Sequence, residues 1–101
     1  IALSAVVRSE LLTGAILSAK PEANRRAAED FCALYPCLPF DAAVADIHAE
    51  WHARLRRAGN LIGTRDLMIA ATALAHGLTV VTHNTGEFTR ISGLRVEDWQ
   101  A

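Results

Sequence analysis

The sequence predicts an α/β fold, a three-layer α/β/α sandwich around a parallel sheet. Helical and strand patterns alternate along the chain with short joins, which is typical of parallel sheets. The continuous apolar run at residues 78–82 fits a parallel strand that is covered on both faces. With 101 residues, 51% of them hydrophobic, the chain has room for one small core, so we expect a single domain over residues 1–101.

The first part of the chain is predicted to form a strand and two helices. The apolar residues Leu3, Ala5, Val6 and Val7 predict a short buried strand. The apolar positions within 11–16 recur at helical spacing, with Glu10 near the start of that helix. Pro21 suits the first turn of a second helix that runs to about Tyr35. Three side chains of the second helix are expected to point inward: Ala27, Phe31 and Leu34.

Two longer helices are predicted after a brief extended piece at residues 38–40. Asp41 is a good N-cap for the third helix, which Gly59 ends. The apolar positions of this helix share one face: Val44, Ile47, Trp51 and Leu55. Gly63 opens the fourth helix, which stops at residues 76–77.

Three polar side chains are expected to converge at one edge of the sheet. From Asp66 to His76 a helix descends roughly 16 Å, and the strand at residues 78–82 climbs back roughly 16 Å. Asn84 therefore returns to the level of Asp66, and Glu10 lies just past the carboxyl end of the first strand, on the same edge. Two further segments complete the chain, a turn or short helix around Phe88 and an extended stretch over Leu94–Val96.

Clustered carboxylates repel one another, so they are tolerated mainly when a cation neutralises them or one takes up a proton. Oxygen ligands favour Mg²⁺, which Mn²⁺ could replace, and phosphodiester hydrolysis is the natural reaction of such a site. A plainer interpretation stays open. An acid in the first turn of a helix is stabilised by the helix dipole alone, by about 0.3–1 kcal/mol, and Asn84 suits a local turn.

The charge balance limits the way in which this chain could bind a nucleic acid. A net charge of -1 gives no global basic field, so any such contact must be local. Nine arginines against one lysine favour phosphate or carboxylate partners, because the guanidinium group matches them with a planar fork of donors. No segment has the pattern of a signal peptide or membrane anchor, so we expect a soluble cytoplasmic protein.

A second cluster, His48 and His52, places two imidazoles one helical turn apart, as a zinc site would require. The spacing of the nearby Glu50 differs from that of HExxH metalloproteases, and no third ligand is evident. The sequence therefore favours a helix that packs against the core over a zinc site.

Several motifs, in order and spacing, resemble VapC-type PIN domains. Two long runs resemble the second half of that family, residues 62–73 (IGTRDLMIAATA) and 77–88 (GLTVVTHNTGEF), and the closing GLRVEDW at 93–99 resembles its ending. Upstream, SELLTGA at 9–15 resembles the helix that carries the family's glutamate, and LPFD at 38–41 the start of its middle helix. The similarity covers nearly the whole chain.

The resemblance implies a magnesium- or manganese-dependent endoribonuclease, the toxin of a type II toxin-antitoxin pair. Such toxins cleave tRNA or other structured RNA, are usually dimeric and are inhibited by a VapB-like antitoxin. By motif match, Asp66 and Glu10 are implied metal ligands, and Asn84 is a further catalytic-site residue at a position that is Asp in many PIN domains. Thr82 and Glu87 are implied to support the ligands or face the substrate. Arg65 and Arg90 are candidates for contacts to RNA phosphates, with surface ion pairs as the equal alternative.

The chain departs from the family pattern at its start. PIN domains of this type begin with a hydrophobic strand, central in the sheet, that leads into Asp-Thr-Asn, and this sequence contains no such motif. We therefore expect that the start at Ile1 reflects a fragment, a cleavage or an upstream segment that the sequence does not include. The departure also leaves a second function open, a catalytically impaired or truncated PIN module that binds a partner.

Overall fold

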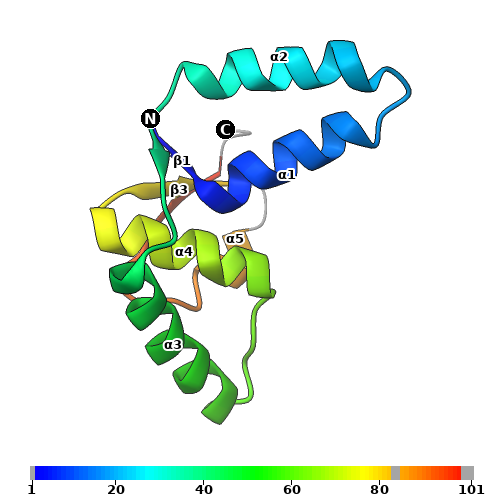
Figure 1. Ribbon diagram of the computed structural model, residues 1–101. Coiled ribbons are helices and arrows are strands. Elements are labelled where there is room, and N and C mark those ends of the chain that lie inside the picture. Colours follow the sequence, from blue (N-terminus) through cyan, green and yellow to red (C-terminus); the bar gives the residue numbers. More distant parts are fainter. Residues whose placement is uncertain (1, 83–84, 99–101) are drawn as a thin grey trace. The chain divides into compact units, whose positions relative to one another are not determined.

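The computed structural model describes residues 2–82 and 85–98, in two compact units that span residues 1–39 and 40–101 (Figure 1). The first unit contains strand β1 (Leu3–Ser4), helix α1 (Ala5–Ile16), helix α2 (Pro21–Ala33) and strand β2 (Cys37–Leu38). Helices α1 and α2 pack side by side, and β1 pairs with β2 in parallel, with Leu3 opposite Cys37.

The first unit corrects the sequence prediction at two places. Residues 5–7 are the first turn of α1 and not part of a strand, because the Ser4 hydroxyl accepts a hydrogen bond from the backbone N–H of Val7 at 3.1 Å and caps the helix there. The predicted inward face of α2 is also wrong, because Ala27 is exposed and Phe31 and Leu34 are 46% and 72% exposed. The buried side chain of α2 is Cys32.

The second unit contains α3 (Ala42–Arg57), α4 (Thr64–His76), β3 (Thr79–Val81), α5 (Thr85–Phe88) and β4 (Arg95–Glu97). Asp41 caps α3 as predicted, since its carboxylate accepts a hydrogen bond from the N–H of Val44 at 3.1 Å. Gly77 ends α4 as predicted, with a φ of 64° that suits glycine. The Arg95 guanidinium donates a hydrogen bond to the Gly77 carbonyl.

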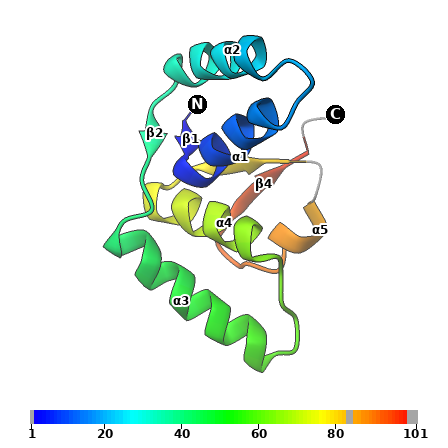
Figure 2. The same ribbon diagram turned by 45° about the vertical axis from the view of Figure 1, so that its right-hand side comes forward.

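Strands β3 and β4 pair in parallel, with Val80 opposite Val96. Figure 2 shows β3 returning along α4, so that α5 lies beside the first turns of that helix. Strand β3 is not covered on both faces as predicted, because Val80 is buried whereas Val81 is 56% exposed. The core of this unit joins α3, α4, β3, α5 and the segment after α5, and its buried members include Leu55, Leu67, Ala70, Val80, Phe88 and Ile91.

None of the helices in the described part of the chain combines the length and apolar character that crossing a membrane requires.

Candidate active site

The site begins at the start of α4. Gly63 precedes the helix in an extended conformation (φ −58°, ψ 143°), and its carbonyl accepts the first helical hydrogen bond, from Leu67 at 2.9 Å. Asp66 is therefore the third residue of the helix, where backbone N–H groups lack helical partners and the dipole favours a negative charge. Its side chain is half-buried, and the next residue, Leu67, is anchored in the core.

A second carboxylate, that of Glu87 in α5, lies near Asp66. A Cβ atom placed on Gly63 would lie 3.9 Å from Oδ2 of Asp66 and 3.9 Å from Oε2 of Glu87. The two oxygens are therefore no farther apart than twice that distance. Both residues are half-buried, and Phe88 anchors α5 in the core beside Glu87. Because Gly63 has no side chain, the surface beside these two carboxylate oxygens carries no Cβ atom.

The loop that carries Gly63 is tied to the end of α5. The Arg90 guanidinium donates a hydrogen bond from Nη1 to the carbonyl oxygen of Leu61 at 2.6 Å, across 29 residues of sequence. Ile62, next in the loop, is buried in the core. Neither interpretation of Arg90 from sequence, an RNA contact or a surface ion pair, anticipated this bond, because a side-chain bond to a distant backbone carbonyl has no local sequence signal. It holds Gly63 and Asp66 against α5.

The other predicted site residues fall in different places. Thr82 is half-buried at the end of β3, where its N–H donates to the Glu97 carbonyl at 2.9 Å, and Arg65 is exposed beside Asp66 in the first turn of α4. Glu10 is exposed in the second turn of α1, in the first unit, farther from the strand than predicted because the strand ends at Ser4. Asn84 lies outside the described residues. The structure thus brings together Asp66 and Glu87, and the convergence of Glu10 and Asn84 on them stays a prediction.

His48 and His52 on α3 are separate from this pair. Their ring centroids are 5.7 Å apart, and the ring of Phe40 packs edge-on against His48. Burial, and then the neighbouring His52, lower the pKa of His48 below its ordinary value, and Nε2 of His48 is buried without a hydrogen-bond partner among the described residues. Within residues 2–82 and 85–98 no three His, Cys, Asp or Glu side chains are grouped as metal ligands, so no third zinc ligand joins the two histidines there.

Comparison with known families identifies the fold. The PIN domain model matches residues 1–94, across both compact units. The chain belongs to the PIN-domain family. Within it, a Shigella flexneri protein named tRNA(fMet)-specific endonuclease VapC is 43% identical over 97 residues, which cover 96% of this chain and 74% of that protein. This likeness places the chain with the VapC proteins and confirms the resemblance predicted from the motifs.

Comparison with solved structures also finds VapC-containing proteins. VapBC-1 from nontypeable Haemophilus influenzae is similar with a TM-score of 0.94 and 32% identity, covering 100% of this chain and 75% of that one. DNA-bound VapBC from Salmonella typhimurium gives a TM-score of 0.90 and 41% identity, covering 95% of this chain and 73% of that one. The predicted fold class, a PIN-type α/β fold with parallel strands, is confirmed.

Proposed function

We propose that this PIN domain is an endoribonuclease toxin of the VapC type that hydrolyses RNA phosphodiester bonds with the help of Mg²⁺. The observation that carries the proposal is the pair of half-buried carboxylates, Asp66 and Glu87, on either side of Gly63. The name of the Shigella flexneri relative supports RNA, and tRNA in particular, as the substrate class. In this proposal the two units of the chain work as one domain.

The donor groups near Gly63 fit Mg²⁺, or Mn²⁺ in its place. Magnesium is usually held by one or two carboxylates, with water and substrate phosphate oxygens completing the ligand set. Asp66 is the first ligand in our proposal, Glu10 the second, and Glu87 a ligand or a group that orients one. When bound, the metal ion would lower the pKa of an attacking water and stabilise charge on the departing oxygen.

The chain's own residues prepare the site in three ways. The first turn of α4 stabilises the charge of Asp66 through the helix dipole. Gly63 places no side chain beside the two carboxylates, so a substrate group could occupy the position where a Cβ atom would touch both oxygens at 3.9 Å. The Arg90 bond to Leu61 restrains the loop that carries Gly63, which helps to position the carboxylates. In our proposal, the neutral side chains of Asn84 and Thr82 join the carboxylates at the site, and Arg65 faces the RNA phosphates.

Cleavage of tRNA by the full-length protein tests this function. Asp66→Asn, which keeps the size of the side chain and removes its charge, is expected to lower the cleavage rate at least 100-fold while the protein stays folded by circular dichroism. Asp46→Asn is the matched control, because Asp46 is exposed on α3 and lies outside the site. Removing divalent ions with EDTA should abolish cleavage, and added Mg²⁺ should restore it. An Asp66→Asn protein that cleaves tRNA at the normal rate contradicts the proposal.

A VapB-like antitoxin is the proposed inhibitor of this activity. Several of the similar solved structures are VapBC assemblies, among them those from Haemophilus influenzae, Rickettsia felis and Salmonella typhimurium. We further propose a homodimer in the cytoplasm, as the sequence resemblance implies. Expression of the full-length protein alone should arrest bacterial growth, and co-expression with its VapB-like partner should relieve the arrest. Arrest that is equally strong with Asp66→Asn would contradict an enzymatic toxin.

A catalytically impaired PIN module that binds a partner is the second candidate. The observation that favours it is in the sequence, where Asn84 stands at a position that is Asp in many PIN domains and no Asp-Thr-Asn motif is present. This candidate predicts that Mg²⁺ leaves the melting temperature unchanged while antitoxin binding is retained. A metal-dependent rise in melting temperature that Asp66→Asn removes would exclude it.

A further inference from the structure

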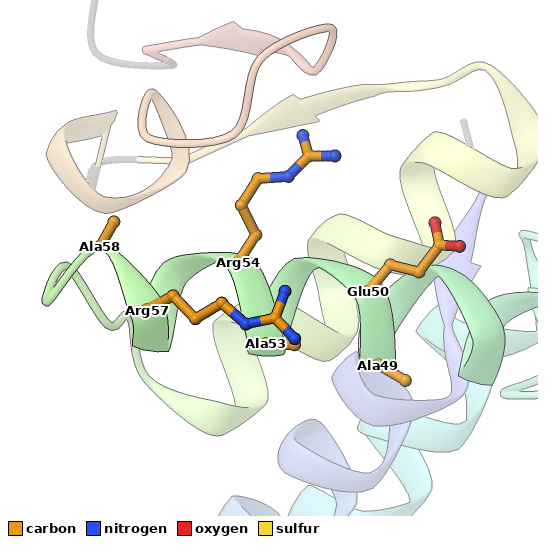
Figure 3. A pocket seen from close by; sticks show the side chains of 6 residues that line it. All are labelled: Ala49, Glu50, Ala53, Arg54, Arg57 and Ala58. Atoms are coloured by element: carbon orange, nitrogen blue, oxygen red, sulfur yellow. The ribbon is translucent and has the colours of Figure 1, made fainter.

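The outer face of α3 carries a groove outside the site described above. It is an open groove of about 730 Å³, lined by residues that share one side of the helix: Ala49, Glu50, Ala53, Arg54, Arg57 and Ala58 (Figure 3). Three alanines form its floor, so a ligand can approach the helix closely. In Figure 3 the Arg57 side chain lies along the helix towards Ala53, and Arg54 extends away from it.

The groove is basic. Two arginines, Arg54 and Arg57, line the groove together with one acidic residue, Glu50, and Arg56 lies in the same last turn of α3 outside the groove. In the part of the chain that the structure describes, none of these three arginines is ion-paired, whereas Arg25 on α2 pairs with Glu29. The guanidinium donors of the groove therefore keep their capacity to bind an anion from outside.

One of the two groove arginines is held in place. The guanidinium of Arg54 lies 4.4 Å from the ring centroid of Trp51, and Trp51 packs against the core. A cation over an indole ring is attracted to it, so Arg54 loses less conformational entropy when it binds a ligand. The helix dipole alone would favour basic residues at the end of α3. It accounts neither for the alanine floor nor for the stacking of Arg54.

The groove lies at the site end of the second unit. Helix α3 ends at Arg57, and the loop after it leads within a few residues to Gly63 and the first turn of α4. The bond between Arg90 and Leu61 fixes that loop. The chain thus connects the end of α3 directly to the site, and a guanidinium fork in the groove suits a phosphate better than an ammonium group would.

We propose that Arg54 and Arg57 bind backbone phosphates of the RNA outside the cleaved bond, and so position the substrate. The inference rests on the proposed function, because it assumes that RNA is the substrate. Contacts of this kind set the position of the RNA and strengthen binding without reading its sequence. The groove is a binding surface, and the chemistry remains with the carboxylates of Asp66 and Glu87.

The test compares two neighbouring arginines. Arg57→Gln and Arg56→Gln remove the same charge from the same helical turn, but only Arg57 lines the groove. Binding of labelled tRNA to the full-length protein is measured over a series of salt concentrations, with Asp66→Asn present in each variant to prevent cleavage. Arg57→Gln should weaken binding roughly three- to tenfold at 0.1 M salt and reduce the salt slope by about 0.7 to 1. Arg56→Gln should change the affinity and the salt slope much less. The double variant with Arg54→Gln and Arg57→Gln should reduce the salt slope by about twice as much as Arg57→Gln alone.

The outcomes separate this inference from the function on which it rests. If the unaltered protein cleaves tRNA but Arg57→Gln and Arg56→Gln bind it equally, the groove is not an RNA surface and the nuclease stands. If the protein neither binds nor cleaves RNA, both proposals fail. A change in oligomeric state by ultracentrifugation, or weaker antitoxin binding, with tRNA binding unaltered would assign the groove to a protein partner and overturn the inference.

Discussion

Replacing Arg90 by methionine tests whether the loop before α4 positions the acidic pair. The substitution keeps the length of the aliphatic chain and removes the hydrogen bond to the Leu61 carbonyl. A hydrogen bond from a charged donor contributes about 1.5–3 kcal/mol, but this one is exposed, so we expect a loss of about 1 kcal/mol in the free energy of unfolding. For a domain of this size that corresponds to a melting temperature lower by about 4–8 °C.

The matched control is Arg95→Met. Arg95 also donates from its guanidinium to a backbone carbonyl, that of Gly77, but it does so at the opposite end of α4. Both variants should therefore lose similar stability. Only Arg90→Met should slow tRNA cleavage, by about tenfold or more, because a displacement of about 1 Å at a catalytic site has effects of up to about 100-fold.

The separate effects of Arg90→Met on kcat and on KM distinguish a role in positioning the site from a role in RNA binding. If Arg90 acts through the loop, kcat falls while KM and the salt dependence of tRNA binding stay close to normal. If Arg90 instead contacts an RNA phosphate, as the sequence also allowed, the salt slope falls by about 0.7 to 1. Equal rates of cleavage in Arg90→Met and Arg95→Met, measured below both melting temperatures, would refute the positioning role.

Two more predictions concern Gly63 and His48. Gly63→Ala should leave the melting temperature unchanged or slightly higher, because φ is −58° and the new methyl group would meet the Asp66 and Glu87 oxygens at an ordinary 3.9 Å, yet it should slow cleavage by filling the space beside them; full activity would contradict that space's role. His48 has a lowered pKa from burial and from His52, so the unfolded chain takes up the proton first and stability falls as the pH drops below about 6.5. In urea titrations at pH 7.5 and 5.5 (both values about 1 unit from that point), His48→Phe should lose less stability on acidification than the unaltered chain, and an equal loss would assign the pH dependence to other groups.

Strong local signals explain the elements that could be predicted from sequence. Asp41 directly precedes an apolar helical pattern, and this position favours an N-cap. Gly77 after α4 provides the positive φ that ends a helix. The same reasoning failed at Val6 and Val7, whose branched side chains favour strands. A single capping bond from Ser4 decided that competition in favour of the helix.

The errors on α2 and β3 have a different cause. Periodicity identifies apolar positions, but which of them become buried depends on the surfaces that neighbouring elements present. Phe31 and Leu34 follow the helical period, yet Cys32 is the buried side chain of α2. Val81 follows Val80 in an apolar run of which one side is exposed. The apolar pattern of one helix or strand does not indicate how much of its surface the neighbouring elements will cover.

The candidate site also contains one residue whose place local sequence determines and one whose place depends on contacts between distant segments. Asp66 could be predicted because its place depends on α4 alone, on a helix that begins after Gly63 and puts an acid in its first turn. The nearness of Glu87 depends on the return of β3, the packing of Phe88 in the core and the bond from Arg90 to the loop, none of which is local. Because those contacts set the distance between the two carboxylates, variants that loosen them should lose catalysis before they lose the fold.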